Sequence, residues 1–477
     1  MAHVEKKRMV TENDKRCGEA EGSTVTANQE GFDRRTFLKT AAASVALATP
    51  AVGLTQSAKA APETTSPPAK NGEGDKAKSA GGFSRTRLGR LHIIMAGHVS
   101  RGQVPGLVTL VSRRGEVNLE AIGTMAVGGS APMQRDTIFR IASVTKPVTA
   151  VAAMILVEEC KIRLDDPVDL WLPELTGRRV LKRIDGPLDD TVPANRPITL
   201  RDLLTFRLGY GAVMVFPSRY PIQKAMEEAG IAPNANLPSL PPDELMNRYG
   251  NLPLAHQPGE KWMYNSGADI LGVLISRVAG IPLESFFHKR IFEPLGMKDT
   301  AFSVPAGKVD RLPPLYQADA VTGRLHVFDK APGGKFTGPP VFESGAGGLV
   351  STVDDLLAFG RMMLNKGRYG NERLLSRLAV ELMTADHLTS EQKAVSPFFP
   401  NFWDNRGWGF GLSMITRRDN MADVPGRFGW DGGYGTSWYV DPREELIGIF
   451  MTQRLWDPGF LAMHQDFWTS AYQAIDT

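Results

Sequence analysis

The sequence predicts an α+β fold, in which an antiparallel sheet built from both chain ends is flanked by helices and carries a mostly helical inserted subdomain. Three observations support this prediction. A helix and a strand hairpin open the folded part, strands return near the C-terminus, and the long middle part is mostly helical in pattern. A shared sheet therefore has to bring the two ends of the chain together.

The first folded elements are a helix over residues 86–102 and a hairpin. Apolar residues recur at helical spacing along 86–102. Residues 106–112 and 117–124 are rich in Val, Leu and Ile, and the segment between them contains Gly115, which suits a tight turn. We expect these two segments to pair as antiparallel strands.

The middle of the chain is predicted to be helical, with an insert over roughly residues 150–340. A long amphipathic segment runs from Ser143 to about residue 159, and Thr199 is a plausible N-cap for the helix that follows. Further helices are expected over residues 198–204, 223–230, 242–249, 268–279, 281–292 and 354–365.

Strand patterns return near the C-terminus. Residues 409–414, 437–440 and 446–451 alternate in polarity or are continuously apolar, with turns between them. A helix over residues 458–474 closes the chain. These strands are the partners we expect for the N-terminal hairpin.

The N-terminal segment, residues 1–60, has the features of a twin-arginine (Tat) export signal. Arg34 and Arg35 are followed by Phe37, a mild apolar run and the small-residue site 58–60, which predicts cleavage after Ala60. The apolar run is too short to favour a membrane anchor. The sequence therefore predicts a periplasmic or secreted protein without a stable membrane span in its mature form.

Residues 61–82 form a linker rich in Pro, Ser, Gly, Lys and Ala, and residues 83–477 form the folded domain. The net charge of +3 is too small to indicate nucleic acid as a partner. The two cysteines, Cys17 and Cys160, suggest neither a disulfide framework nor a metal site. No H-E-x-x-H, G-x-S-x-G or phosphate-loop pattern occurs, so we expect no metal and no cofactor.

Ser143 and Lys146 are the strongest chemical signal in the sequence. A helix over 143–159 places them one turn apart on one face, with Ser143 at its N-terminus. A serine hydroxyl needs a base to become a nucleophile, and a lysine amine becomes one only when its pKa is lowered toward neutrality. The pair is common by chance, so its meaning depends on partners elsewhere in the chain.

Two other segments are candidates for these partners. Residues 258–267 form a loop that enters a helix and contain Tyr264, Asn265 and Ser266. Residues 428–436 are dense in glycine, which allows a strand to approach a ligand closely and present its N–H groups.

Together, these motifs resemble the serine β-lactamase and penicillin-binding protein superfamily. The similarity is to its class C-like branch, which includes class C β-lactamases, D-Ala-D-Ala carboxypeptidases and family VIII carboxylesterases. It covers roughly residues 83–477 and rests on three motifs in the family's order: Ser-Val-Thr-Lys at 143–146, Tyr-Asn-Ser at 264–266 and Trp-Asp-Gly at 430–432. The supporting stretches are residues 198–205, 257–259 and 347–352.

The resemblance implies a role for each motif. Ser143 would be the acylated nucleophile, with Lys146 assisting its deprotonation. Tyr264 would act as a base or proton shuttle, which requires nearby cations to favour its phenolate because its free pKa is near 10. The oxyanion hole would use the N–H groups of Ser143 and Gly433. Ser266, Asn265, Trp430, Asp431 and Gly432 would contact the substrate.

Two departures from the family pattern alter the expected substrate. The second motif usually ends in Asn, and here Ser266 holds that position while Asn265 is shifted by one. The third motif usually carries a cation that meets the substrate carboxylate, and here it is Trp430-Asp431-Gly432. A motif without a cation is similar to the esterase branch and should weaken recognition of β-lactams and D-Ala-D-Ala peptides.

The sequence thus predicts an exported serine hydrolase that works through an acyl-enzyme, with carboxylic esters or simple amides as preferred substrates. A class C-like β-lactamase or D-Ala-D-Ala carboxypeptidase is the enzymatic alternative, and a non-catalytic cell-wall-binding relative is the alternative from another class. The expected partner is a small-molecule ester, amide or β-lactam. The sequence leaves the acyl-chain length, the natural substrate and the oligomeric state open.

Overall fold

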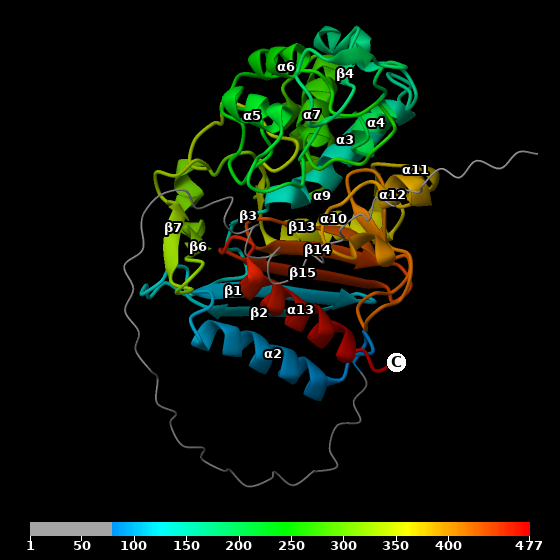
Figure 1. Cartoon of the computed structure of the whole chain (residues 1–477). Coiled ribbons are helices and arrows are strands. Elements are labelled where there is room, and N and C mark those ends of the chain that lie inside the picture. Colours follow the sequence, from blue (N-terminus) through cyan, green and yellow to red (C-terminus); the bar gives the residue numbers. More distant parts are fainter. Residues whose placement is uncertain (1–78) are drawn as a thin grey trace, which may run out of the picture.

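A seven-stranded antiparallel sheet is the centre of the structure, a computed structural model that describes residues 79–477 (Figure 1). The export signal predicted over residues 1–60, and all but the last residues of the linker, lie outside the described part. The strand order is β11-β12-β13-β14-β15-β1-β2. The strands are β1 (Gly106–Arg113), β2 (Glu116–Gly123), β11 (Arg406–Trp408), β12 (Ser413–Ile415), β13 (Phe428–Gly432), β14 (Thr436–Asp441) and β15 (Leu446–Thr452).

The two chain ends meet in this sheet, as the α+β prediction requires. Strand β1 pairs with β2 on one side and with the C-terminal β15 on the other, where Leu110 lies opposite Ile449. The side chains of β1 alternate between two buried clusters, with Leu107 and Val111 in one and Val108 and Leu110 in the other. Both faces are therefore covered, which explains why β1 is a continuous apolar run.

Helices α2 (Arg85–Ser100) and α13 (Pro458–Gln473) cover one face of the sheet, and α10 (Val353–Leu364) packs on the other (Figure 1). Gly448 allows α13 to lie close to β15. A Cβ atom at this position would stand 2.4 Å from the Trp468 ring, a distance that real Cβ atoms do not adopt. The absence of a side chain at Gly448 therefore allows the terminal helix to pack closely on the sheet.

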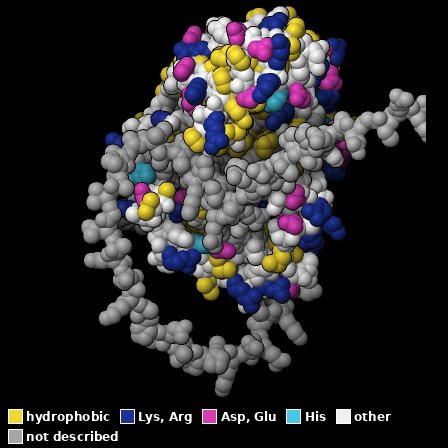
Figure 2. All heavy atoms as spheres, in the orientation of Figure 1, with side chains coloured by type: hydrophobic (Ala, Val, Ile, Leu, Met, Phe, Trp, Pro, Cys, Tyr) yellow, Lys and Arg dark blue, Asp and Glu magenta, His cyan; other side chains and the backbone are white. Residues whose placement is uncertain are grey.

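A helical lobe lies beyond α10, at the top of Figure 1. Thr199 and Asp202 form the predicted cap, since each side chain accepts the other's backbone N–H. Figure 2 shows basic and acidic side chains interspersed over this lobe, consistent with a small net charge. The helices are α3 (Thr145–Glu158), α4 (Leu200–Leu204), α5 (Pro221–Glu228), α6 (Pro242–Asn251), α7 (Ser266–Ala279), α8 (Leu283–Phe287) and α9 (Glu293–Leu295).

Two local predictions differ from the structure, and a hairpin is present that was not predicted. The helix expected over 281–292 is divided into α8, a π-helical turn His288–Phe292 and α9. Of the strand expected over 409–414, only residues 413 and 414 are strand, at the start of β12, while residues 409–412 form the turn between β11 and β12. In this turn Gly411 has a positive φ of 66° and packs against the backbone of α3. That segment is apolar because the turn is buried. The hairpin of β6 (Leu315–Ala318) and β7 (Leu325–Asp329) was not predicted.

No single helix within residues 79–477 combines the length and apolarity needed to cross a membrane. The consecutive segments Ser266–Ala279 and Leu283–Leu295, bent by 75°, meet that test only as a pair and only by length and composition.

Candidate active site

Ser143 lies in a short 3-10 turn, Ala142–Val144, between strand β3 (Phe139–Arg140) and helix α3. The sequence predicted a serine inside the first helical turn, and the structure places it just before that turn. The segment is held on both sides. Arg140 forms a buried ion pair with Asp329, with its Nε 2.8 Å from Oδ2, and Thr436 Oγ1 donates to the carbonyl of Ile141 at 3.0 Å. The nucleophile candidate is thus fixed from the sheet and from the β6–β7 hairpin.

Lys146 and Tyr264 both donate hydrogen bonds to the Ser143 hydroxyl. Lys146 Nζ and Tyr264 OH each lie 2.8 Å from Ser143 Oγ. Lys146 Nζ also donates to the carbonyl of Ala346 at 2.6 Å, and it stands 4.6 Å from the centre of the Tyr264 ring. The structure therefore brings the serine of the first motif together with the lysine of the first motif and the tyrosine of the second.

Burial gives Lys146 the properties of a base at neutral pH. Its side chain is fully enclosed, and this desolvation lowers its pKa from the ordinary 10.5 to about 7, while the Asp269 carboxylate opposes the shift. A substantial fraction of the amine is then uncharged near pH 7 and has a lone pair for the Ser143 proton. Most lysines, which stay charged until about pH 10, lack this capacity.

Tyr264 is held as a neutral phenol. Burial raises its pKa above the ordinary 10, although the hydrogen bonds with Ser143 and Trp430 act in the opposite direction. The sequence left open whether nearby cations would favour the phenolate. Among the described residues, Lys146 is the basic side chain next to the ring, and burial destabilises its charge. Lys146 therefore does little to favour the phenolate. Tyr264 is thus suited to relay a proton and Lys146 to accept one.

Trp430 occupies the place where the third motif would carry a cation. Its Nε1 donates to Tyr264 OH at 2.8 Å, so the phenol accepts from Trp430 while it donates to Ser143. Aromatic rings surround Tyr264, with centroid distances of 5.8 Å to Trp262, 5.9 Å to Phe206 and 5.2 Å to Phe398. These contacts fix the phenol in one orientation, and they supply no positive charge.

Asp269 is a buried acid of this site that the sequence did not predict. It lies on α7, one helical turn after Ser266, and is only 5% exposed. Its Oδ1 accepts from Ser344 Oγ at 2.6 Å and from the N–H of Ala346 at 3.1 Å. The signal available in the sequence was its spacing of three residues from Ser266, which places both on one helix face.

Among the described residues, the backbone N–H of Gly433 has no hydrogen-bond partner, and that of Ser143 has none outside its own 3-10 turn. Gly433 lies in the turn between β13 and β14, and both residues line the same cavity. Gly432 was predicted to contact the substrate, and in the structure it has a packing role. A Cβ atom there would stand 2.3 Å from the carbonyl of Ile141, so this glycine allows β13 to approach the Ser143 turn closely.

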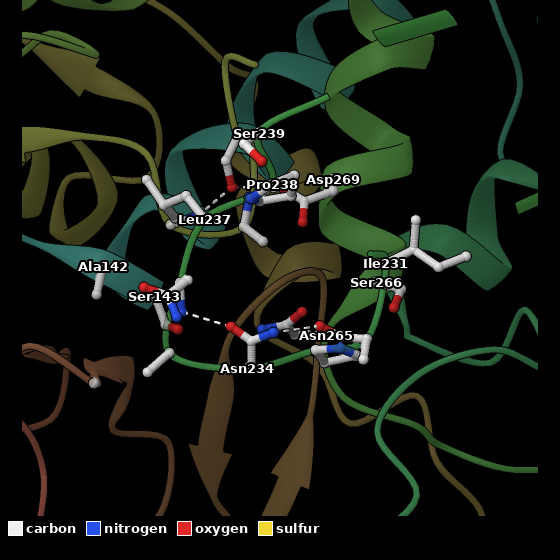
Figure 3. A pocket seen from close by; sticks show the side chains of 18 of the residues that line it. Ala142, Ser143, Ile231, Asn234, Leu237, Pro238, Ser239, Asn265, Ser266 and Asp269 are labelled. Atoms are coloured by element: carbon white, nitrogen blue, oxygen red, sulfur yellow. Dashed lines mark hydrogen bonds between the residues drawn. The ribbon is translucent and has the colours of Figure 1, made fainter. Parts of the chain in front are cut away.

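A cavity of about 270 Å³ opens over Ser143 (Figure 3). Asn265 and Ser266, two of the predicted substrate-binding residues, line it. Much of the remaining wall is the segment 230–239, which the Tyr434 hydroxyl secures by donating to the carbonyl of Ala235 at 2.7 Å. Among the described residues that line the cavity there is no Lys, Arg or His, and the acid is Asp269.

The structure corrects the expectation that Asp431 contacts the substrate. Successive side chains of β13 point to opposite faces, so Trp430 faces Tyr264 while Asp431 faces α13. The Asp431 carboxylate lies 2.9 Å from His464 Nε2 and accepts from Ser437 at 2.6 Å and Tyr439 at 3.0 Å. It ties the third motif to the terminal helix.

Comparisons with known proteins agree with this geometry. The model of the Beta-lactamase family matches residues 92–470. The chain belongs to the beta-lactamase family. An uncharacterized protein from Mycobacterium tuberculosis (strain CDC 1551 / Oshkosh) is 40% identical over 74% of this chain and 86% of its own length. Esterase EstB from Burkholderia gladioli is 29% identical over 77% of this chain and 91% of its own length.

Among solved structures, EstCE1, described as a hydrolase with promiscuous acyltransferase activity, superposes with a TM-score of 0.68. It is 25% identical and covers 82% of this chain and 99% of its own. The protein is therefore a serine hydrolase of the beta-lactamase fold, related to esterases and acyltransferases. The α+β fold and the family resemblance predicted from the sequence are confirmed.

The Asp431 contacts predict a pH-dependent contribution to stability. Burial alone would raise the pKa of Asp431, but the charge and hydrogen bond of His464, with Ser437 and Arg406, lower it from 3.8 to about 2. A depressed folded-state pKa stabilises the fold above the unfolded-state value near about 4, and the gain is lost as the pH falls toward about 2. Asp431→Asn should therefore lower the free energy of unfolding by roughly 2 kcal/mol at pH 7 and by less at pH 3.

Urea denaturation of the protein at the two pH values measures this difference. Glu445→Gln is a matched control, because it removes an exposed acid paired with Arg114 and should cost less than about 1 kcal/mol at either pH. An equal loss of stability from Asp431→Asn at pH 7 and pH 3 would contradict the assignment.

Proposed function

We propose that this protein hydrolyses neutral carboxylic esters or simple amides through an acyl-enzyme formed on Ser143. The observation that carries the proposal is the set of two 2.8 Å contacts to one serine oxygen, from a lysine with a pKa of about 7 and from a neutral tyrosine. A serine, a base and a proton relay at this spacing are the requirements of nucleophilic acyl transfer.

Acylation follows from these positions. Ser143 Oγ attacks the substrate carbonyl carbon, and its proton passes to the uncharged Nζ of Lys146. The negative charge that develops on the carbonyl oxygen is stabilised by the N–H groups of Ser143 and Gly433. When the C–O bond to the leaving group breaks, Tyr264 OH gives that oxygen a proton, and the proton that Lys146 took from Ser143 restores the phenol. The alcohol leaves, and the acyl group remains on Ser143.

Deacylation uses the same groups in reverse. As the oxygen of a water molecule attacks the acyl carbon, the water passes a proton to Tyr264 while Tyr264 passes its own proton to Lys146, and the bond to Ser143 Oγ then breaks. The serine oxygen recovers the proton and the carboxylic acid is released. No group other than these side chains and backbone amides is needed for the proton balance.

The preference for neutral substrates rests on charge. The described cavity wall carries no basic side chain, and the position of the third-motif cation is occupied by Trp430. A substrate carboxylate would be desolvated there without a partner and would stand near the buried acid Asp269. β-Lactams and D-Ala-D-Ala peptides carry such a carboxylate, whereas simple esters do not.

Acyl transfer to an alcohol is a second candidate. The chain resembles EstCE1, whose description includes promiscuous acyltransferase activity. An acyl-enzyme can react with any hydroxyl that reaches it, so an alcohol with higher affinity than water for the cavity would become the acceptor. The Asn265 amide and the Ser239 hydroxyl on the cavity wall provide hydrogen bonds for such an alcohol (Figure 3).

The first prediction concerns the three catalytic side chains. With p-nitrophenyl butyrate as substrate, Ser143→Ala should lower kcat/KM by at least about a thousandfold because it removes the nucleophile. Tyr264→Phe should lower it by about 10² to 10⁴, the usual contribution of a positioned proton-transfer group. Ser100→Ala, on the surface of α2, is the matched serine control and should leave the rate unchanged.

The same preparations distinguish the alternatives. Hydrolysis of nitrocefin is expected to have a kcat/KM at least about 100-fold below that of the butyrate ester, because its carboxylate lacks a cation. A nitrocefin rate above the ester rate would overturn the ester preference. If neither substrate reacted and a phosphonate failed to label Ser143, the non-catalytic alternative would replace the proposal.

The pH dependence follows from Lys146. Its uncharged form is the active one, so log kcat/KM for the ester should rise with a slope near one below pH 7 and level off above it. Initial rates in buffers from pH 5 to pH 9 measure this profile, and a rate that falls as the pH rises through 7 would contradict a lysine base.

The acyltransferase candidate predicts a new product. With butanol added to the p-nitrophenyl butyrate reaction, butyl butyrate should form in competition with butyric acid, while the early release of p-nitrophenol proceeds at the acylation rate. Gas chromatography separates the two products, and Ser143→Ala should abolish both. Butyric acid alone at high butanol concentration would restrict the enzyme to hydrolysis.

A further inference from the structure

Asp269 is a buried carboxylate beside the proposed nucleophile, and the mechanism above gives it no role. It lines the same cavity as Ser143 (Figure 3). Both of its hydrogen bonds, from Ser344 and Ala346, end on Oδ1, and no described residue donates to Oδ2. Burial raises the pKa of Asp269, whereas the hydrogen bonds from Ser344 and Ala346 and the nearby Lys146 lower it. Keeping a carboxylate charged in so buried a place is costly, which indicates that the charge itself has a use.

The Asp269 carboxylate is connected to Lys146 through a single peptide unit. The N–H of Ala346 donates to Asp269 Oδ1 at 3.1 Å, and the carbonyl of the same residue accepts from Lys146 Nζ at 2.6 Å. Next to it, Thr149 on α3 donates to the carbonyl of Gly345 at 2.8 Å. A Cβ at Gly345 would stand 2.5 Å from the carbonyl of Ala268 on α7. The segment from Ser344 to Gly347 is thus clamped between α7 and α3, and it carries the acceptor that orients the Lys146 amine.

The other groups that face the amine are uncharged. They are the Ser143 hydroxyl, the Ala346 carbonyl and the Tyr264 phenol, whose pKa is raised by burial. Tyr249 on α6 faces Asp269, and burial together with the Asp269 charge raises its pKa as well. Within the described residues, Asp269 is therefore the source of charge that acts on Lys146.

We infer that Asp269 is a positioning residue for Lys146, which fixes the amine through Ala346 and supplies the negative charge that sets its proton affinity. This inference rests on the proposed function of Lys146 as the base. Desolvation lowers the pKa of the amine, and the carboxylate opposes that shift. An amine with too low a pKa would release its proton easily but would be a weaker base toward Ser143. The Asp269 carboxylate therefore keeps the pKa of the Lys146 amine from falling so far that the amine is a poor base.

The test is Asp269→Asn, which keeps an acceptor oxygen for Ser344 and Ala346 and removes the charge. Labelling of Ser143 by paraoxon is followed from pH 5 to pH 9, because the rate of phosphorylation reports the protonation of Lys146 without substrate turnover. In a plot of labelling rate against pH, the rise on the acidic side is called the acidic limb here. Without the carboxylate this limb should move to lower pH by about one unit, the usual effect of a nearby opposite charge. Labelling on the plateau should also be slower, since the amine is a weaker base.

Ser344→Ala is the matched control. It removes the 2.6 Å hydrogen bond to Oδ1 while the N–H of Ala346 and the charge remain. Its limb should stay at the wild-type position, and a purely structural role of Asp269 would instead change the labelling rates of both variants without moving either limb.

The possible outcomes separate the two proposals. If the wild-type protein is not labelled at any pH, the proposed function fails. If it is labelled with a limb near pH 7 and Asp269→Asn leaves that limb in place, this inference alone is overturned. Should Asp269→Asn not fold, Asp269→Ser with added formate gives the same comparison. Its limb should lie below that of the wild type and return upward with formate but not with chloride, and the absence of a formate effect would overturn the inference.

Discussion

The removal of the Lys146 amine from water is the constraint on which the rest of the site depends. The amine is enclosed by α3, by the segment from Ser344 to Gly347 and by the ring of Tyr264, and this enclosure lowers its pKa to about 7. A buried amine is tolerable only if its donors are satisfied, which the Ser143 hydroxyl and the Ala346 carbonyl achieve. The hydrogen bonds that keep Lys146 folded inside the protein are therefore the same ones that aim it at the serine.

The aromatic wall around Tyr264 connects this constraint to specificity. Trp430 takes the position of a cation and donates one neutral hydrogen bond to the phenol, so the site gains a fixed tyrosine and forgoes a partner for a substrate carboxylate. On the opposite face of the same strand, Asp431 has a structural role, since it joins the sheet to α13 through His464. One three-residue motif thus orients the proton relay on one face and holds the terminal helix on the other.

Much of the fold could be predicted because its signals are local. The spacing of apolar residues located α2, α7, α10 and α13 to within a few residues, and Thr199 indicated its own cap. The same approach failed at residues 409–412, because this buried turn is as apolar as a strand. The β6–β7 hairpin was missed for the converse reason, because its short strands carry few buried apolar residues.

The sequence by itself determined the chemical types of the site: a serine and a lysine three residues apart, a tyrosine before a helix, and a third motif with Trp in place of a cation. Those identities suffice for the family and for the expectation of a neutral substrate. Only the tertiary structure decided which groups act together. It turned Asp431 away from the cavity, brought in Asp269, and lowered the pKa of Lys146 so that its amine can accept a proton near neutral pH. The reason is physical, because a pKa and a side-chain direction depend on the surrounding dielectric and on neighbours from distant parts of the chain, which no local pattern records.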